Sequence, residues 1–182
     1  MDFNEGKAYF KKGVSIFKLE NKTILNVSKD EKASNYAFLF FAIAGLAYSA
    51  GFLTINSAIG TIFLTLIGSF VHVGMIHFLA KFFGGKGDYM ELYRAYGVGS
   101  VAHFIAFIPI IGPLFGSVLT LWYLVVNTRI VKLVYKLSTK RAFAAVFLPF
   151  LVMVIIVSIL LVIVITAIFA AVLLSLGNNF NL

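Results

Sequence analysis

The chain contains a long apolar region, residues 142–176, where 35 consecutive side chains carry no charge. Apolar stretches of about 20 residues also occur earlier, and a helix of that length spans the roughly 30 Å hydrocarbon layer of a bilayer. The chain as a whole is 61% hydrophobic and only 12% charged. These features predict an all-α polytopic membrane protein.

The hydrophobic pattern predicts five transmembrane helices, over residues 36–55, 59–83, 95–108, 114–135 and 142–176. Small residues recur in the first pair, Gly45 with Ser49 at four-residue spacing and Gly60 with Gly68 at eight, and they favour close helix packing. The third segment is short, at about 21 Å of helical rise. The uncharged turn at residues 109–113 should lie close to the membrane, and Pro149 should bend the last helix.

The basic residues predict the orientation of these segments. All 15 Lys and Arg residues fall in residues 1–35, 77–96 and 129–141, whereas the two intervening turns and the tail after residue 176 contain none. By the positive-inside rule the N-terminus is cytoplasmic and the C-terminus outside. The lysine-rich, cysteine-free composition is typical of a prokaryotic protein, so we expect an integral, multi-pass protein of a prokaryotic cell membrane.

The chain divides into a cytoplasmic segment, residues 1–35, and a membrane domain, residues 36–182. In the first segment Phe10, Val14 and Phe17 recur at helical spacing, and lysines occupy other angles of the same helix. This pattern predicts a basic amphipathic helix in the headgroup layer. The alternative is a disordered leader, because Gly13 weakens a helix.

Residues 77–96 form a polar hinge between two apolar regions. Asp88 and Glu91 have the spacing of a capping box, which predicts that a helix begins there. The preceding loop, Gly84-Gly85-Lys86-Gly87, lacks the P-loop spacing. It serves either as a flexible hinge or as a phosphate cradle, in which case a lipid headgroup is the natural ligand.

Few polar residues occur within the predicted spans. His72 and His77 are five residues apart and do not form an i, i+4 metal pair, so no metal site is predicted. Arg129 either extends to the interface or joins Asn127 in a polar cluster with residues 88–94. The candidate binding residues are His77, Gly84, Gly85, Lys86, Asp88, Glu91, Arg94, His103, Asn127 and Arg129. No catalytic motif occurs, and we expect neither enzymatic activity nor a cofactor.

Several of these segments resemble the Yip domain of Ypt/Rab-interacting membrane proteins. The resemblance rests on residues 77–96 with their Gly-Gly-Lys-Gly loop, the turn at 109–113, the segment 121–136 and the link 137–142. It implies a five-helix membrane domain and a prokaryotic-type member of the family. Eukaryotic relatives are associated with secretory traffic, Rab binding and membrane shaping through a longer N-terminal region than this one.

Two functions remain open. The first is a Yip-like protein that organises or shapes membrane and binds partners, including anionic lipid headgroups, at its cytoplasmic face. The second is a channel or transporter for a small solute or ion, because the third and fourth segments are short and interrupted by prolines. A homo-oligomer or a protein partner is compatible with both, and nothing indicates nucleic-acid binding.

Overall fold

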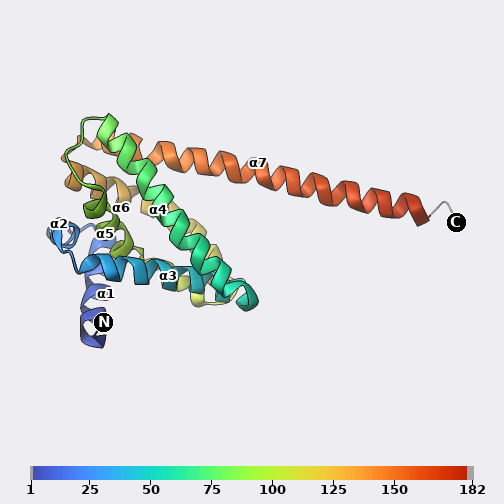
Figure 1. Ribbon diagram of the computed structural model, residues 1–182, viewed down its shortest axis with the longest axis horizontal. Helices are drawn as coiled ribbons and strands as arrows, with labels where there is room; N and C mark the ends of the chain where they lie inside the picture. Colours follow the sequence, from blue (N-terminus) through green and yellow to red (C-terminus); the bar gives the residue numbers. More distant parts are fainter. Residues whose placement is uncertain (1, 180–182) are drawn as a thin grey trace. The chain divides into compact units, whose positions relative to one another are not determined.

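The computed structural model describes residues 2–179, without the side chains of residues 55, 113, 117, 172 and 174–179. Its elements are α1 (Phe3–Phe17), α2 (Asn21–Lys29), α3 (Ala33–Gly51), η1 (Ile55–Ser57), α4 (Ala58–Phe82), α5 (Tyr89–Gly99), η2 (Ser100–Phe107), α6 (Ile111–Tyr135) and α7 (Thr139–Asn179) (Figure 1). All elements of the described residues are helical, which confirms the predicted class. Two compact units result, residues 1–147 and residues 148–182.

Four helices among the described residues are long and apolar enough to cross a membrane. They are Ala33–Gly51, Ala58–Phe82, Leu114–Tyr135 and Thr139–Ala171. α5 is absent from this set because it is only 11 residues long. The 3₁₀ helix η2 follows it directly. The predicted count of five therefore depends on whether α5 and η2 together form one crossing.

The first two spans form the predicted helical hairpin, with η1 at its tip. At Gly45 a Cβ would lie 2.8 Å from Thr65 Oγ1 and 3.0 Å from the Ile62 Cα, so glycine permits the close approach of α3 and α4. No atom lies within 4 Å of a Cβ built at Gly60 or Gly68. The packing role predicted for that second pair is wrong, because both residues are exposed.

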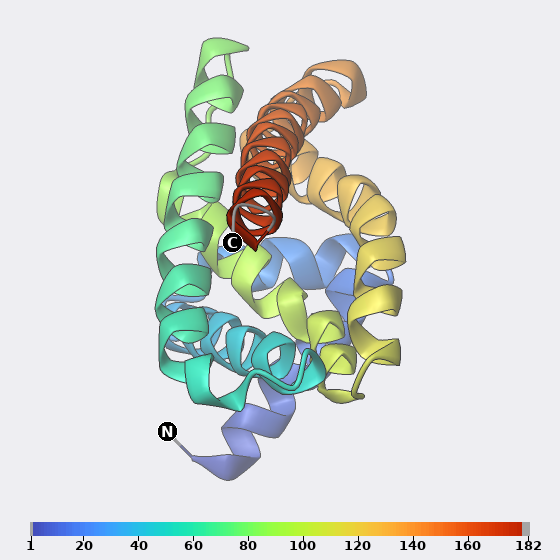
Figure 2. The ribbon, with the colours of Figure 1, turned by 90° about the vertical axis from the view of Figure 1, so that its right-hand side faces the viewer.

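Helix α5 is enclosed on several sides, because it contacts α1, α2, α3, α4 and α6. Figure 2 shows α5 and η2 lying between α4 and α6. Seven residues of α5 are buried, including the whole stretch from Ala95 to Gly99. The small side chains of this stretch allow neighbouring helices to approach, since a Cβ at Gly97 would meet Ala37 of α3.

The N-terminal segment contains two helices packed on the membrane-spanning ones, and this contradicts the alternative of a disordered leader. Ile16, Ile24 and Val27 are fully buried in the same hydrophobic core as α3, α5 and α6. The amphipathic helix is present, but its buried residues are Tyr9, Gly13 and Ile16. The helix therefore packs on the protein through a face next to the one formed by Phe10, Val14 and Phe17, and the placement of that apolar face in the headgroup layer stays a prediction.

The second half of unit 1 contains the predicted turns. Ile110 adopts φ of 64° and its N–H donates to the Gly51 carbonyl at 2.9 Å, so the two uncharged turns lie side by side. At the other end, Lys136 adopts the left-handed conformation and ends α6.

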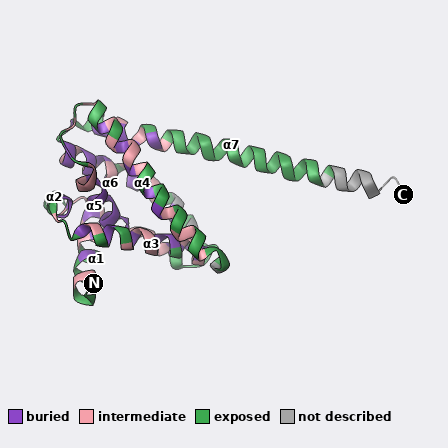
Figure 3. Ribbon diagram, in the orientation of Figure 1, coloured by how far each residue is buried: buried purple, intermediate pink, exposed green. Residues whose placement is uncertain are grey.

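The second unit is the remainder of α7, which continues as a helix through Pro149. Every described side chain of residues 151–171 is exposed (Figure 3), and nearly all are apolar. Lipid is the natural surrounding of such a helix. The bend expected at Pro149 stays a prediction.

Candidate functional site

The glycine loop at residues 84–87 is packed tightly against the end of α6. A Cβ at Gly85 would lie 2.7 Å from the Tyr135 ring, and one at Gly87 would lie 2.7 Å from the Val134 carbonyl oxygen. The Lys86 N–H donates to the Tyr135 carbonyl at 3.0 Å. The glycines therefore allow two backbones to meet, which argues against the flexible hinge predicted from the sequence.

The same contacts argue against a phosphate cradle in this loop. The N–H groups of Gly84 and Gly85 donate to carbonyls of the preceding helix, at 2.9 and 2.8 Å, and the Lys86 N–H is also engaged. A cradle needs several such groups pointing at the anion. Here the N–H groups of Gly84, Gly85 and Lys86 donate to carbonyl groups of the protein itself.

Tyr135 joins three elements at this end of the bundle. Its buried hydroxyl lies 2.5 Å from His77 Nδ1 of α4 and donates to the Asp88 carbonyl at 3.3 Å. Asp88 and Glu91 form the predicted capping box, in which the Asp88 carboxylate accepts from the Met90 N–H at 2.9 Å. The acidic side chains thus hold the start of α5.

Two arginines hold the N-terminal helices instead of joining this group. Arg94 donates through Nη1 to the Ser28 carbonyl of α2 at 3.3 Å and through Nε to Ser34 Oγ of α3 at 2.8 Å. Arg129 Nε donates to Asn21 Oδ1 of α2 at 2.8 Å. The predicted cluster of Arg129 with residues 88–94 is therefore wrong. The partners are neutral residues distant in sequence, so no charge pattern indicates them.

A second set of polar contacts involves His103 and Asn127, each of which lies beside a tyrosine. His103 Nδ1 is 3.0 Å from the Tyr48 hydroxyl, and its ring stacks on Tyr123 with centroids 4.3 Å apart. Asn127 neighbours the hydroxyl of Tyr96, which has no hydrogen bond of good geometry among the described residues. The Tyr96 hydroxyl and the Asn127 side chain are therefore neighbours that form no well-aligned hydrogen bond.

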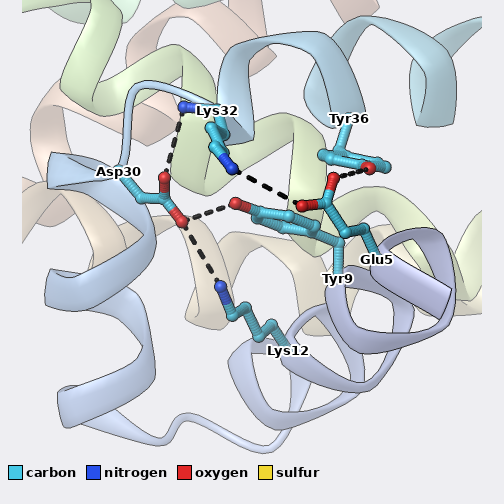
Figure 4. A network of polar contacts seen from close by, with 6 residues as sticks. All are labelled: Glu5, Tyr9, Lys12, Asp30, Lys32 and Tyr36. Atoms are coloured by element: carbon cyan, nitrogen blue, oxygen red, sulfur yellow. Dashed lines mark hydrogen bonds and ion pairs between the residues drawn. The ribbon is translucent and has the colours of Figure 1, made fainter. Parts of the chain in front are cut away.

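A third polar group, shown in Figure 4, joins α1 to the start of α3 and was missed in the sequence. The Tyr9 hydroxyl donates to Asp30 Oδ2 at 2.5 Å, and Lys12 pairs with the same oxygen at 3.3 Å. Glu5 accepts from the Tyr36 hydroxyl at 2.9 Å and pairs with Lys32 at 3.5 Å. Lys12 and Lys32 could not be singled out from the sequence, because lysines occur throughout this N-terminal segment.

These contacts shift the pKa values of Tyr9 and Asp30, which lie outside the spanning helices. Burial raises the pKa of Tyr9, and the hydrogen bond to the Asp30 carboxylate raises it further. Burial also acts to raise the pKa of Asp30, but the hydrogen bonds from Tyr9 and Lys12 outweigh that effect and lower it. Asp30 is therefore held as a carboxylate that fastens α1 to the α2–α3 loop.

Among the described residues, no three His, Cys, Asp or Glu side chains are placed to hold a metal ion. A family model described as the Yip1 domain matches residues 24–162, which is most of the chain. No curated protein and no solved structure matches.

Proposed function

This chain belongs to the Yip1 domain family of integral, multi-pass membrane proteins, and we propose that it organises or shapes membrane without enzymatic activity. The proposal rests on α1, which packs against α3, α5, α6 and η2 as a fixed part of the fold. Its own outward face supplies the surface that acts on the bilayer.

The contacts of α1 hold it crosswise. Tyr9 stacks on Tyr36 near the start of α3, with ring centroids 4.1 Å apart. At the end of α1, the Phe17 carbonyl accepts from Trp122 Nε1 of α6 at 3.1 Å. Because the middle and the end of α1 touch two different spanning helices, α1 lies across them, as Figure 1 shows for its crossing with α3.

The outward face of α1 combines aromatic and basic side chains. Phe3 is 85% exposed and lies seven residues before Phe10 on one face of the helix. Phe10 is 42% exposed, and its ring also lies beside Phe104 of η2, with centroids 6.1 Å apart. Lys7 and Lys11 are exposed beside them. A helix of this kind inserts its apolar side at the headgroup boundary and expands one leaflet relative to the other. Expansion of one leaflet favours a curved membrane.

We further propose five crossings, with the N-terminus in the cytoplasm and the C-terminus outside. α5 rises about 16 Å and η2 about 16 Å, so together they match the hydrocarbon thickness. The hydrogen bond between Ile110 and Gly51 places two uncharged turns at one end of the bundle. The basic loops meet at the other end, where Arg141 donates to the Phe83 carbonyl at 3.3 Å. That division of charge supports the orientation.

The test is curvature in reconstituted vesicles. We expect the wild-type protein to produce tubules or vesicles of smaller diameter, seen by electron microscopy, and the Phe3→Ser/Phe10→Ser variant to lose most of that effect. Phe82→Ser is the matched control, because Phe82 is 76% exposed at the end of a spanning helix outside α1. Vesicles of unchanged shape with wild-type protein would reject the proposal, as would equal loss in the control.

The alternative function is passage of a small solute or ion, and one observation favours it. The third crossing is interrupted between α5 and η2, with His103 in η2 and the unpaired Tyr96 hydroxyl in α5. Interrupted helices are a feature of substrate sites in transporters. Flux of chloride and glycerol in the same vesicles decides it: flux that Arg129→Ala abolishes would promote transport, and no flux would leave the membrane-organising proposal.

A further inference from the structure

A groove of about 430 Å³ lies between α6 and the first residues of α7. Three basic residues line it, Arg129, Lys132 and Lys140, together with the hydroxyls of Thr128 and Thr139. No acidic residue lines it. We propose that this groove binds the phosphate of an anionic phospholipid.

Two of the three basic side chains are held in place by hydrogen bonds, and none of the three is neutralised by an ion pair among the described residues. Lys132 Nζ donates to Thr139 Oγ1 at 2.9 Å, and Arg129 uses Nε to reach Asn21. The ion pairs formed among the described residues are Lys12 with Asp30 and Lys32 with Glu5, so the three cations of the groove take part in none of them. Positive charge in a confined site without a counter-ion attracts an anion.

The backbone around the groove adds to this preference. Thr139 is the first residue of α7, and the N–H groups at the start of a helix point toward an anion. Lys132 lies in the last turn of α6, where cations are favoured. The basic side chains and the helix ends therefore surround a space whose wall is mostly apolar.

The rest of the groove identifies the anion as a lipid. Leu124, Val125 and Phe143 line its other part, and they belong to helices long and apolar enough to span the membrane. Inorganic phosphate makes no favourable contact with that apolar wall, whereas the acyl chain of a lipid packs against it. Basic pockets between spanning helices on the cytoplasmic side are known to hold phospholipid headgroups.

This inference deepens the proposed role of anionic lipids and rests on the proposed placement of the basic end at a headgroup layer. It does not depend on curvature, so the two proposals can fail separately.

The experiment uses Trp122, the single tryptophan of the chain, which is 40% exposed on α6 one turn before Val125. Full-length protein is reconstituted in phosphatidylcholine vesicles that contain brominated phosphatidylglycerol or brominated phosphatidylcholine. Bromine quenches the fluorescence of tryptophan that it touches. We expect the anionic lipid to quench more at low mole fraction, which gives it a relative affinity above one.

The variants locate the site. Lys140→Gln should lower the relative affinity about fivefold, which is the effect of one charge near an anionic lipid. Lys132→Gln/Lys140→Gln should remove the preference. Lys81→Gln, which removes an exposed charge from the same end of the bundle but not from the groove, should leave it unchanged.

Three results would overturn the inference. Equal quenching by the two lipids would show that the groove has no preference for an anion. Equal loss in Lys81→Gln would show a diffuse surface effect. Reversal of the preference by millimolar inorganic phosphate would show an anion site instead of a lipid site. Absence of quenching by both lipids would instead reject the placement of α6 against lipid.

Discussion

Gly13 sets how closely α1 approaches α5 and η2. A Cβ at this position would meet the carbonyl oxygen of Val98 and lie 2.6 Å from the Val101 side chain. The backbone of Val98 lies in a buried helix and has no room to shift. One missing side chain therefore decides the position of the helix on which the proposed function rests.

The substitution Gly13→Ala should destabilise the protein by about 1–3 kcal/mol, the usual cost of overpacking. Gly6→Ala on the same helix is the matched control, because a Cβ there meets only Tyr36 Cε1 at 4.0 Å. Alanine is the better helix former, so the control should be neutral or slightly stabilising. Thermal unfolding in detergent measures both, and equal melting temperatures for the two variants would contradict the contact.

Asp30 makes the docking of α1 dependent on pH. Its pKa is lower in the folded protein than in the unfolded chain, so its contribution is fully present above the unfolded value of about 3.9. That contribution is lost as the pH falls through the lower folded value. We expect α1 to be held equally between pH 5 and 8 and to loosen below about pH 4.

Asp30→Asn should weaken this docking by about 1 kcal/mol at neutral pH, because the group is partly exposed and its interactions are screened. Amide hydrogen exchange in residues 3–29, corrected for the intrinsic effect of pH, reports it. Glu31→Gln is the control, an exposed carboxyl of the same loop. Exchange that is unchanged in Asp30→Asn would refute the role.

At the scale of elements, α5 is held by its surroundings at both ends. Its start is capped by Asp88 and Glu91, and the loop before it is bonded to the end of α6. Its end passes into the 3₁₀ helix η2, where Ser100 Oγ donates to the Gly97 carbonyl at 2.7 Å. Polar groups at a break in a membrane helix are satisfied internally in this way.

The cap of α5 provides a direct test. Asp88→Ala removes the acceptor of the Met90 N–H and should cost about 0.5–2 kcal/mol of stability. Tyr135 should be little affected, because it bonds the Asp88 carbonyl, which alanine retains. The melting temperature of the purified protein measures the loss, with Asp88→Asn expected to retain most of the stability. A variant Asp88→Ala as stable as the wild type would show that the cap is dispensable.

For the whole molecule, the orientation is the property that other proposals depend on. The chain has no cysteine, so single cysteines label one site each. Ser57→Cys lies at the tip of the α3–α4 hairpin and should react with an impermeant maleimide in intact cells. Ser138→Cys, in the basic loop before α7, should react only after lysis. Both residues are exposed. The reverse pattern would place the basic end outside.

The sequence by itself determined the class, four of the predicted spans and the start of α5. Whether a segment spans the bilayer depends mainly on its length and its apolarity. Both are read directly from the order of residues, so the sequence is enough to locate such segments. The capping box was predictable for a similar reason, since Asp88 and Glu91 act on their own turn of helix. The family resemblance, which the comparison with known families confirms, likewise rests on local segments.

Only the tertiary structure decided which side chains meet. Arg129 reaches Asn21 and not the acidic residues near α5, and the Tyr36 hydroxyl reaches Glu5 of α1. Gly13, not the apolar residues around it, touches Val98. Such pairs depend on how each helix is rotated about its axis and on which helices are neighbours. Hydrophobicity specifies these only weakly in lipid, because a spanning helix is apolar on every side.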